Sequence, residues 1–144
     1  MKTNELMLGD WVMFGDTPYT IATIAAQDMV IIEAEAEKSK FYRAESLEPI
    51  PVTYEILSAN GWDFQWGGDG EVYFFIGDYE DAVDFDVRRA DESNKGDSSL
   101  FDGDILIPMW GAEIEVRYVH EIQHLLRLCK WEECHELANN FKIK

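Results

Sequence analysis

The segment His120-Glu121-Ile122-Gln123-His124 matches the pattern H-E-x-x-H of zinc peptidases. In such enzymes the two histidines, one helical turn apart, bind the zinc ion, and the glutamate between them acts as general base on the metal-bound water. One hypothesis is therefore a zinc-dependent hydrolase. Its candidate metal ligands are His120 and His124, and its candidate catalytic residue is Glu121.

Helix geometry and chain length count against that hypothesis. At about 100° per residue, the apolar stripe of this helix centres near Ile122 and Cys129. His120, His124 and Arg127 fall almost opposite, on the face that we expect to meet solvent. No histidine follows at the metzincin spacing, and only twenty residues remain after His124. We therefore assign no catalytic residue, no metal and no cofactor, and we expect a non-enzymatic protein.

A purely structural metal site is a further alternative. Five side chains within sixteen residues are of types that suit zinc: His120, His124, Cys129, Cys134 and His135. In one straight helix Cys129 faces away from the two histidines, so only a sharp break near Lys130 would gather them. The same geometry puts Cys129 and Cys134 on different sides of a helix, and we expect free thiols rather than a disulfide.

The front of the chain predicts a small antiparallel β-barrel, similar to Src-homology-3 barrels. Short β-rich runs separated by turn residues cover residues 11–14, 19–24, 29–32 and 41–47. Pro49-Ile50-Pro51 closes this unit, because proline fixes an extended connection and cannot extend the centre of a sheet.

The remainder predicts a short helix, an antiparallel sheet and a C-terminal helix. Thr53 is a candidate N-cap, and Asn60-Gly61 is typical of a helix C-terminus. Aromatic alternation over residues 62–66 and 71–76 predicts a hairpin. Apolar side chains at helical spacing predict the last helix from Tyr118, with a second helix or bent continuation after it.

The fold class is thus α+β. We divide the chain into a barrel-like unit of residues 1–52 and an α+β unit of residues 53–144, with one compact domain as the alternative.

Charge limits the class of partner. The chain has 29 acidic and 12 basic residues, a net charge of −17. Residues 53–117 hold 16 acidic and 4 basic residues, which gives −12. Such a field repels phosphate, so we expect no direct nucleic-acid binding, whereas a protein partner with a basic surface fits. Solubility alone is the alternative reason for the acidity.

Membrane and export signals are not found in the sequence. No apolar run approaches the about 18 residues of a membrane-spanning helix. Residues 1–10 lack the apolar stretch of a signal peptide. We expect no membrane association and a cytoplasmic location, and the oligomeric state stays open.

Three stretches carry a resemblance: Leu6–Val12, Leu47–Trp62 and Tyr118–Leu125. Their order resembles a family of uncharacterised small proteins of gut Bacteroidetes and their phages. The resemblance implies a β-rich front, the short helix and a C-terminal helix, and it implies no activity. Relatives often carry glutamine at the position of Glu121 and asparagine at that of His124, which a zinc peptidase could not tolerate.

We therefore expect a non-enzymatic protein-interaction or accessory module. A role linked to phages or mobile elements is one version of this hypothesis. A small barrel offers grooves for peptides. Trp11, Trp62, Trp66 and Trp110 are candidates for an exposed aromatic patch, although aromatic residues in strands often belong to the core. Two alternatives stay open: the zinc-dependent hydrolase, and an acidic decoy that occupies the basic surface of a nucleic-acid-binding protein.

Overall fold

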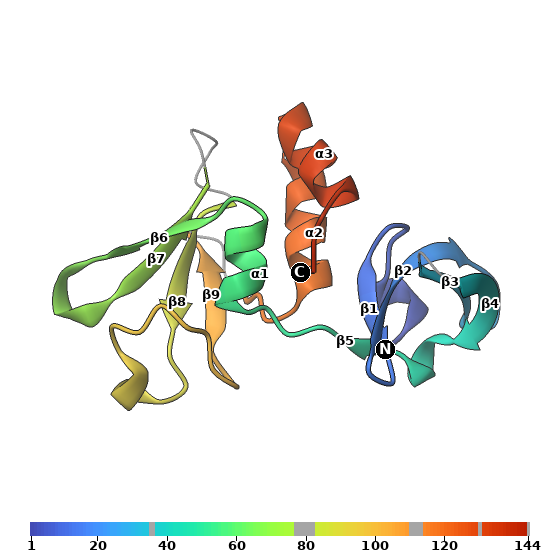
Figure 1. The fold of residues 1–144 in the computed structure, drawn as a ribbon, viewed down its shortest axis with the longest axis horizontal. Helices are drawn as coiled ribbons and strands as arrows, with labels where there is room; N and C mark the ends of the chain where they lie inside the picture. The colour runs from blue at the N-terminus through green and yellow to red at the C-terminus, as the bar shows by residue number, and fades with distance from the viewer. Residues whose placement is uncertain (35–36, 77–82, 110–113, 130, 144) are drawn as a thin grey trace.

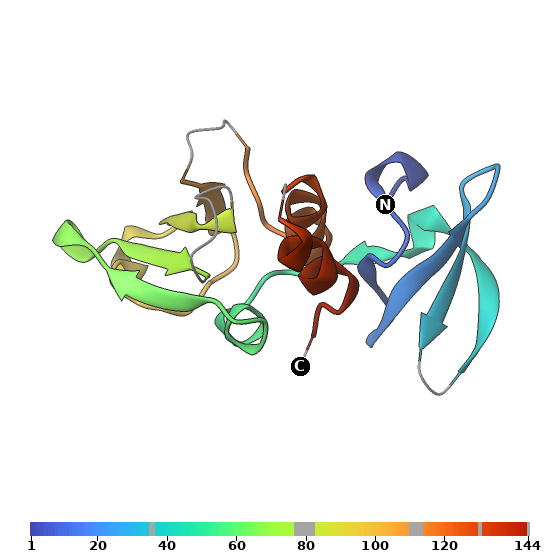
Figure 2. The same cartoon turned by 90° about the horizontal axis from the view of Figure 1, so that it is seen from above.

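The structure of the chain, a computed structural model, describes residues 1–34, 37–76, 83–109, 114–129 and 131–143. The described residues form an α+β fold with two antiparallel sheets and three α-helices. Figures 1 and 2 show the two sheets at opposite ends of an elongated molecule, with α2 and α3 between them. No helix of the described residues is long and apolar enough to cross a membrane.

The first sheet is curled and five-stranded. Its strands are β1 (Trp11–Phe14), β2 (Thr17–Ile24), β3 (Met29–Ala34), β4 (Glu37–Arg43) and β5 (Glu48–Pro49), in the order β4-β3-β2-β1-β5. Successive side chains of a strand point to opposite faces, and Val12, Tyr19, Ile21, Val30 and Ile32 fill the inside of the curl. We call residues 1–49 the N-terminal lobe.

The second sheet has four strands in sequence order. They are β6 (Asp63–Trp66), β7 (Val72–Phe75), β8 (Phe85–Arg88) and β9 (Ile105–Pro108). The predicted hairpin is confirmed as β6 and β7. Strand β9 closes the sheet, and Val116 forms an isolated bridge to Leu106.

Helix α1 (Tyr54–Ala59) follows its sequence signals closely. The Thr53 side chain accepts a hydrogen bond from the Ile56 N–H at 3.2 Å, as an N-cap residue does. Gly61 then adopts a φ of 99°, a left-handed conformation that glycine tolerates at a helix end. The predicted short helix is confirmed.

The main hydrophobic core lies between the second sheet and the helices. Helix α2 (Val119–Leu128) buries Val119, Ile122 and Leu126 in the same cluster as Phe74 and Phe85 of the sheet. Burying a side chain of this size contributes about 1.5–3 kcal/mol. We call residues 50–143, with α1, α2, α3 and the second sheet, the C-terminal lobe.

Helix α2 does not continue into α3 (Glu132–Asn139). Cys129 ends α2 in an extended conformation, with φ −67° and ψ 142°. The resulting turn brings the buried Cys129 and Cys134 thiols close to each other. The expectation that they lie on different sides of one helix is therefore wrong, because the helix breaks between them. Burial raises the pKa of the Cys134 thiol to about 12.

Candidate functional site

The H-E-x-x-H segment forms the first turns of α2, which lies between the two lobes (Figure 1). The expectation that its polar face meets solvent is wrong. His120 is only 7% exposed, and both His124 and Arg127 contact Asp10 of the N-terminal lobe. The reason is that α2 packs on both sides: its apolar stripe meets the second sheet, and its polar face meets the loop before β1.

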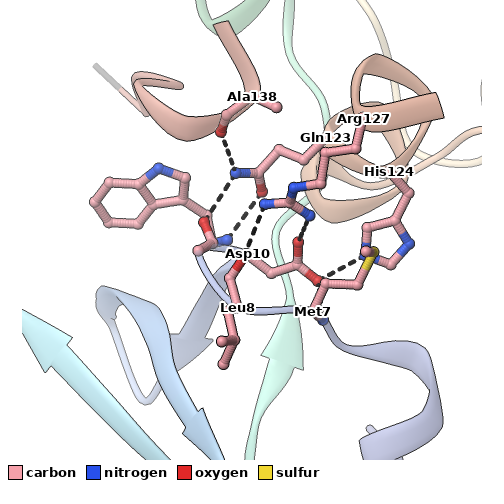
Figure 3. Close-up of polar contacts among 9 residues, drawn as sticks. Met7, Leu8, Asp10, Gln123, His124, Arg127 and Ala138 are labelled. Atoms are coloured by element: carbon pink, nitrogen blue, oxygen red, sulfur yellow. Dashed lines mark hydrogen bonds and ion pairs between the residues drawn. The ribbon is translucent and has the colours of Figure 1, made fainter. Parts of the chain in front are cut away.

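Asp10 is the centre of the polar contacts between the lobes (Figure 3). Its side chain is 0% exposed. Its carboxylate lies 2.5 Å from Arg127 Nη1 and 2.7 Å from His124 Nε2, and it accepts the Met7 N–H at 2.7 Å. A buried carboxylate is tolerated only when it is paired and hydrogen-bonded, and these contacts satisfy both needs. We call Asp10, His124 and Arg127 the Asp10 cluster.

Gly9 allows the Arg127 guanidinium to approach the loop before β1 closely. Its φ is 86°, and a β-carbon at this position would lie 3.3 Å from Arg127 Nη2. The same guanidinium donates a hydrogen bond to the Leu8 carbonyl at 3.1 Å. A side chain at residue 9 would therefore be strained by its backbone and crowded by the arginine.

Gln123 joins three segments through one buried amide (Figure 3). It is 0% exposed. Its Oε1 accepts the Trp11 N–H at 2.9 Å, and its Nε2 donates to the carbonyls of Gly9 and Ala138 at 3.0 and 3.2 Å. Because Ala138 belongs to α3, the amide ties α2 to α3 and to the N-terminal lobe at once.

Asp10 and Gln123 are residues of this junction that the sequence did not predict. A usable signal exists for Gln123, which follows Val119 by four residues and precedes Leu126 by three. That spacing puts it at the flank of the apolar stripe and indicates a buried amide. No comparable local signal marks Asp10, whose side-chain partners His124 and Arg127 lie more than a hundred residues away.

Glu121 caps the helix on which it stands. One carboxylate oxygen, Oε1, accepts the backbone N–H groups of Arg117 and Tyr118, both at 3.0 Å. A carboxylate in this place satisfies N–H donors that the first turn of a helix leaves unpaired, and it also interacts favourably with the helix dipole. The candidate general base thus has a structural role at the N-terminus of α2.

His120 stacks on Tyr118, with ring centroids 6.1 Å apart and an interplanar angle of 11°. Its Nδ1 is buried and has no hydrogen-bond partner. The His124 ring lies edge-on at 5.5 Å between centroids. Among the described residues, no group of three or more His, Cys, Asp or Glu side chains could hold a metal ion. The break after Leu128 therefore does not gather the five candidate ligands around one point.

No protein-family model, curated protein or solved structure matches the chain. The stretches Leu47–Trp62 and Tyr118–Leu125 contact each other, and Leu6–Val12 contacts the second of them. The Val119 N–H donates to the Ile50 carbonyl at 2.9 Å, and Pro51 forms an isolated bridge with Tyr118. Gln123 supplies the contact to Gly9 described above, so the first and last stretches together form the junction of the lobes.

The described tryptophans do not form one exposed patch. Trp62 is buried in the core and donates its indole N–H to the Val83 carbonyl. Trp11 is half-buried at the lobe junction and donates to the Phe141 carbonyl, whereas Trp66 is exposed on β6. The expected patch is wrong for these three, and Trp110 lies outside the described residues.

His120 predicts a pH dependence of stability. Burial is the main cause that lowers its pKa below the ordinary value of 6.5, and the Glu121 charge only partly opposes it. The unfolded chain therefore binds this proton more readily than the folded chain. The free energy of unfolding should fall as the pH decreases below about 6.5, and this contribution should be constant above that pH.

The measurement is urea denaturation of the wild type and of His120→Phe between pH 5 and 8. Phenylalanine keeps the ring stacked on Tyr118 and cannot bind the proton. The stability difference between the two proteins should shift in favour of the variant as the pH falls. A difference that is independent of pH would contradict the prediction.

Proposed function

We propose that the chain is a non-enzymatic protein-interaction or accessory module whose partner carries a basic surface. The observation that supports this best is the use of the H-E-x-x-H side chains within the fold. The Glu121 carboxylate receives two backbone N–H groups at 3.0 Å, and His124 Nε2 lies 2.7 Å from Asp10. The first contact caps α2 and the second joins α2 to the N-terminal lobe, so both side chains serve the fold, and such an arrangement suits a protein that presents a surface.

The chemistry of the partner follows from charge. A net charge of −17 favours association with a cationic surface and disfavours phosphate backbones and anionic membranes. A cytoplasmic location belongs to the same proposal. The acidic decoy is a narrower form of it, in which the basic surface of the partner is one that otherwise binds nucleic acid.

Two finer statements are also part of the proposal. The likeness of the N-terminal lobe to Src-homology-3 barrels is supported by its five short antiparallel strands and by a 3₁₀ turn, Ala44–Ser46, directly before β5. Membership of the gut Bacteroidetes and phage family, with a role linked to phages or mobile elements, is also part of the proposal, and it rests on the order of the three resembling stretches in the sequence alone.

The proposed function is tested on protein expressed in its native host without a histidine tag. Captured proteins are identified by mass spectrometry, and zinc is measured in the same preparation. We expect a specific partner with a basic surface, an association that weakens steeply as salt screens the charges, and less than about a tenth of an equivalent of zinc.

Two results would contradict the proposal. One is a full equivalent of zinc together with peptide hydrolysis that is lost in Glu121→Gln. The other is the absence of a specific partner at low salt. A specific partner whose binding is insensitive to salt would keep the interaction function and exclude the basic surface.

A further inference from the structure

We infer that the outward face of the second sheet is a docking surface for a cationic amphipathic helix of a protein partner. This inference rests on the proposed function and adds the place of binding and the form of the partner. The outward face is the side of β6–β9 turned away from α1 and α2. Its central residues are Asp63, Tyr73, Phe75, Asp86, Arg88 and Ile107.

Strand alternation defines this face. On the inward side Val72, Phe74, Phe85 and Leu106 are buried against the helices. The residues between them point the other way, because successive side chains of a strand alternate. Cross-strand pairing then makes neighbours of Tyr73 and Asp86, of Asp86 and Ile107, and of Asp63 and Phe75.

The composition of the face is unusual for a solvated sheet. The open side of an antiparallel sheet is normally polar. Here Phe75 is exposed, Tyr73 and Ile107 are partly exposed, and Met109 is exposed just beyond the end of β9. The exposed apolar side chains of β7 and β9 lie on either side of the charged Asp86 and Arg88 of β8, so the face offers apolar and charged contacts together.

The charges of the face favour a cation. Asp63, Glu71 and Asp86 are its acids, and its one cation among the described strand residues, Arg88, lies 3.4 Å from Glu115. Partial burial, with a smaller effect of Glu71, raises the pKa of Asp86, so a cation bound beside it would relieve an unfavourable environment.

Several of these charged side chains line a hollow at one end of the face. It measures about 290 Å³, and its lining includes Glu71, Asp86, Glu92, Arg88 and Ile107. Arg89 also lines it, but its guanidinium lies 2.7 Å from Asp104, and Lys95 lies at the same hollow. The lining itself holds three acids and three cations, but Arg88 and Arg89 pair with Glu115 and Asp104 outside it, so Lys95 is the one lining cation among the described residues whose charge is left to balance Glu71, Asp86 and Glu92. A lysine or arginine next to an aliphatic side chain therefore fits this hollow.

The dimensions of the sheet favour a helix as the occupant. Four strands about 4.8 Å apart span about 14 Å, and an α-helix with its side chains is about 10–12 Å wide. Strands of four residues are about 13 Å long, which matches about nine helical residues at 1.5 Å each. Helices are also the elements that cover the faces of sheets in α+β proteins.

The test uses three designed fourteen-residue peptides and the full chain labelled with ¹⁵N. The first peptide places lysine and leucine at helical spacing, the second has the same composition without that spacing, and the third replaces lysine by glutamate. We expect only the first peptide to bind saturably, with one peptide per chain. The changes in amide chemical shift should be centred on β7, β8 and β9.

Two double variants that remove the same charge distinguish an effect of the outward face from an effect of the net charge. Asp63→Asn with Asp86→Asn should weaken binding of the first peptide by about tenfold. Glu45→Gln with Glu48→Gln, two exposed acids of the N-terminal lobe, removes the same charge and should change binding by less than about twofold. Equal weakening by both pairs, shift changes centred elsewhere, or equal binding of the second peptide would overturn the inference.

The same variants distinguish this inference from the proposed function. If the native partner binds the Asp63→Asn, Asp86→Asn chain as well as the wild type, the inference is wrong and the interaction function stands. If the wild type captures no specific partner while the first peptide maps to the outward face, the proposed function fails and the docking chemistry of the face stands.

Discussion

Replacing Asp10 by asparagine is expected to lower the free energy of unfolding by about 3 kcal/mol. Asparagine keeps the size of the side chain and removes its charge, so the Arg127 guanidinium loses its counter-ion at 2.5 Å. Breaking a buried pair on one side typically costs about 3–5 kcal/mol, and we expect the lower value because the Arg127 side chain is still 15% exposed. Urea denaturation at pH 7 measures the change.

Asp16→Asn is the matched control, because Asp16 is exposed in the turn between β1 and β2. It should change stability by no more than about 0.5 kcal/mol. Asp10→Asn combined with Arg127→Met should lose less than the sum of the two single variants, since the second change removes the unpaired charge. A loss below about 1 kcal/mol in Asp10→Asn would show that the Asp10 cluster does not hold the lobes together.

Gln123→Leu should also cost about 3 kcal/mol. Leucine has a similar volume, but it leaves the Trp11 N–H and the carbonyls of Gly9 and Ala138 without their partner. Each buried polar group left without a hydrogen bond costs about 1–3 kcal/mol. Denaturation measures the total, and hydrogen exchange of the Trp11 amide reports the lost bond directly.

Gln65→Leu provides the control for the same chemical change. Gln65 is exposed on β6, so we expect a stability change within about 0.5 kcal/mol and normal exchange at Trp11. Unchanged exchange at Trp11 in Gln123→Leu would contradict the assigned hydrogen bond, whatever the effect on stability.

The two variants act on the same junction and their effects should not add. Asp10 and Gln123 both connect the loop before β1 to α2, within a few residues of each other on each side. Once one contact is lost, the loop can move and the other contact stabilises less. The double variant therefore measures how far the two lobes behave as one cooperative unit.

Local signals in the sequence were enough for several elements. Thr53 and Asn60-Gly61 mark α1, because capping depends on residues within one helical turn. The alternation of aromatic residues marks the β6–β7 hairpin. The apolar stripe of α2 placed Ile122 and Cys129 on one face, and both are buried, because helical spacing and burial on one face are linked by geometry.

The environment of the polar face of α2 could not be predicted from helical periodicity. Periodicity separates an apolar face from a polar one, but it does not show whether the polar face meets water or another part of the chain. His124 and Arg127 meet Asp10, which lies 114 and 117 residues away. A second helix after α2 was one of the predicted alternatives, but the sequence did not show that the turn between α2 and α3 would bring Cys129 and Cys134 together.

By itself, then, the sequence determined the α+β composition, the short helix, the hairpin, the core-facing stripe of α2 and the acidity of the middle of the chain. Only the tertiary structure decided which roles the side chains of His120-Glu121-Ile122-Gln123-His124 have in the protein. The physical reason is that capping and amphipathicity act over a few residues, whereas the roles of Glu121, Gln123 and His124 depend on which backbone and side-chain groups the folded chain brings beside them.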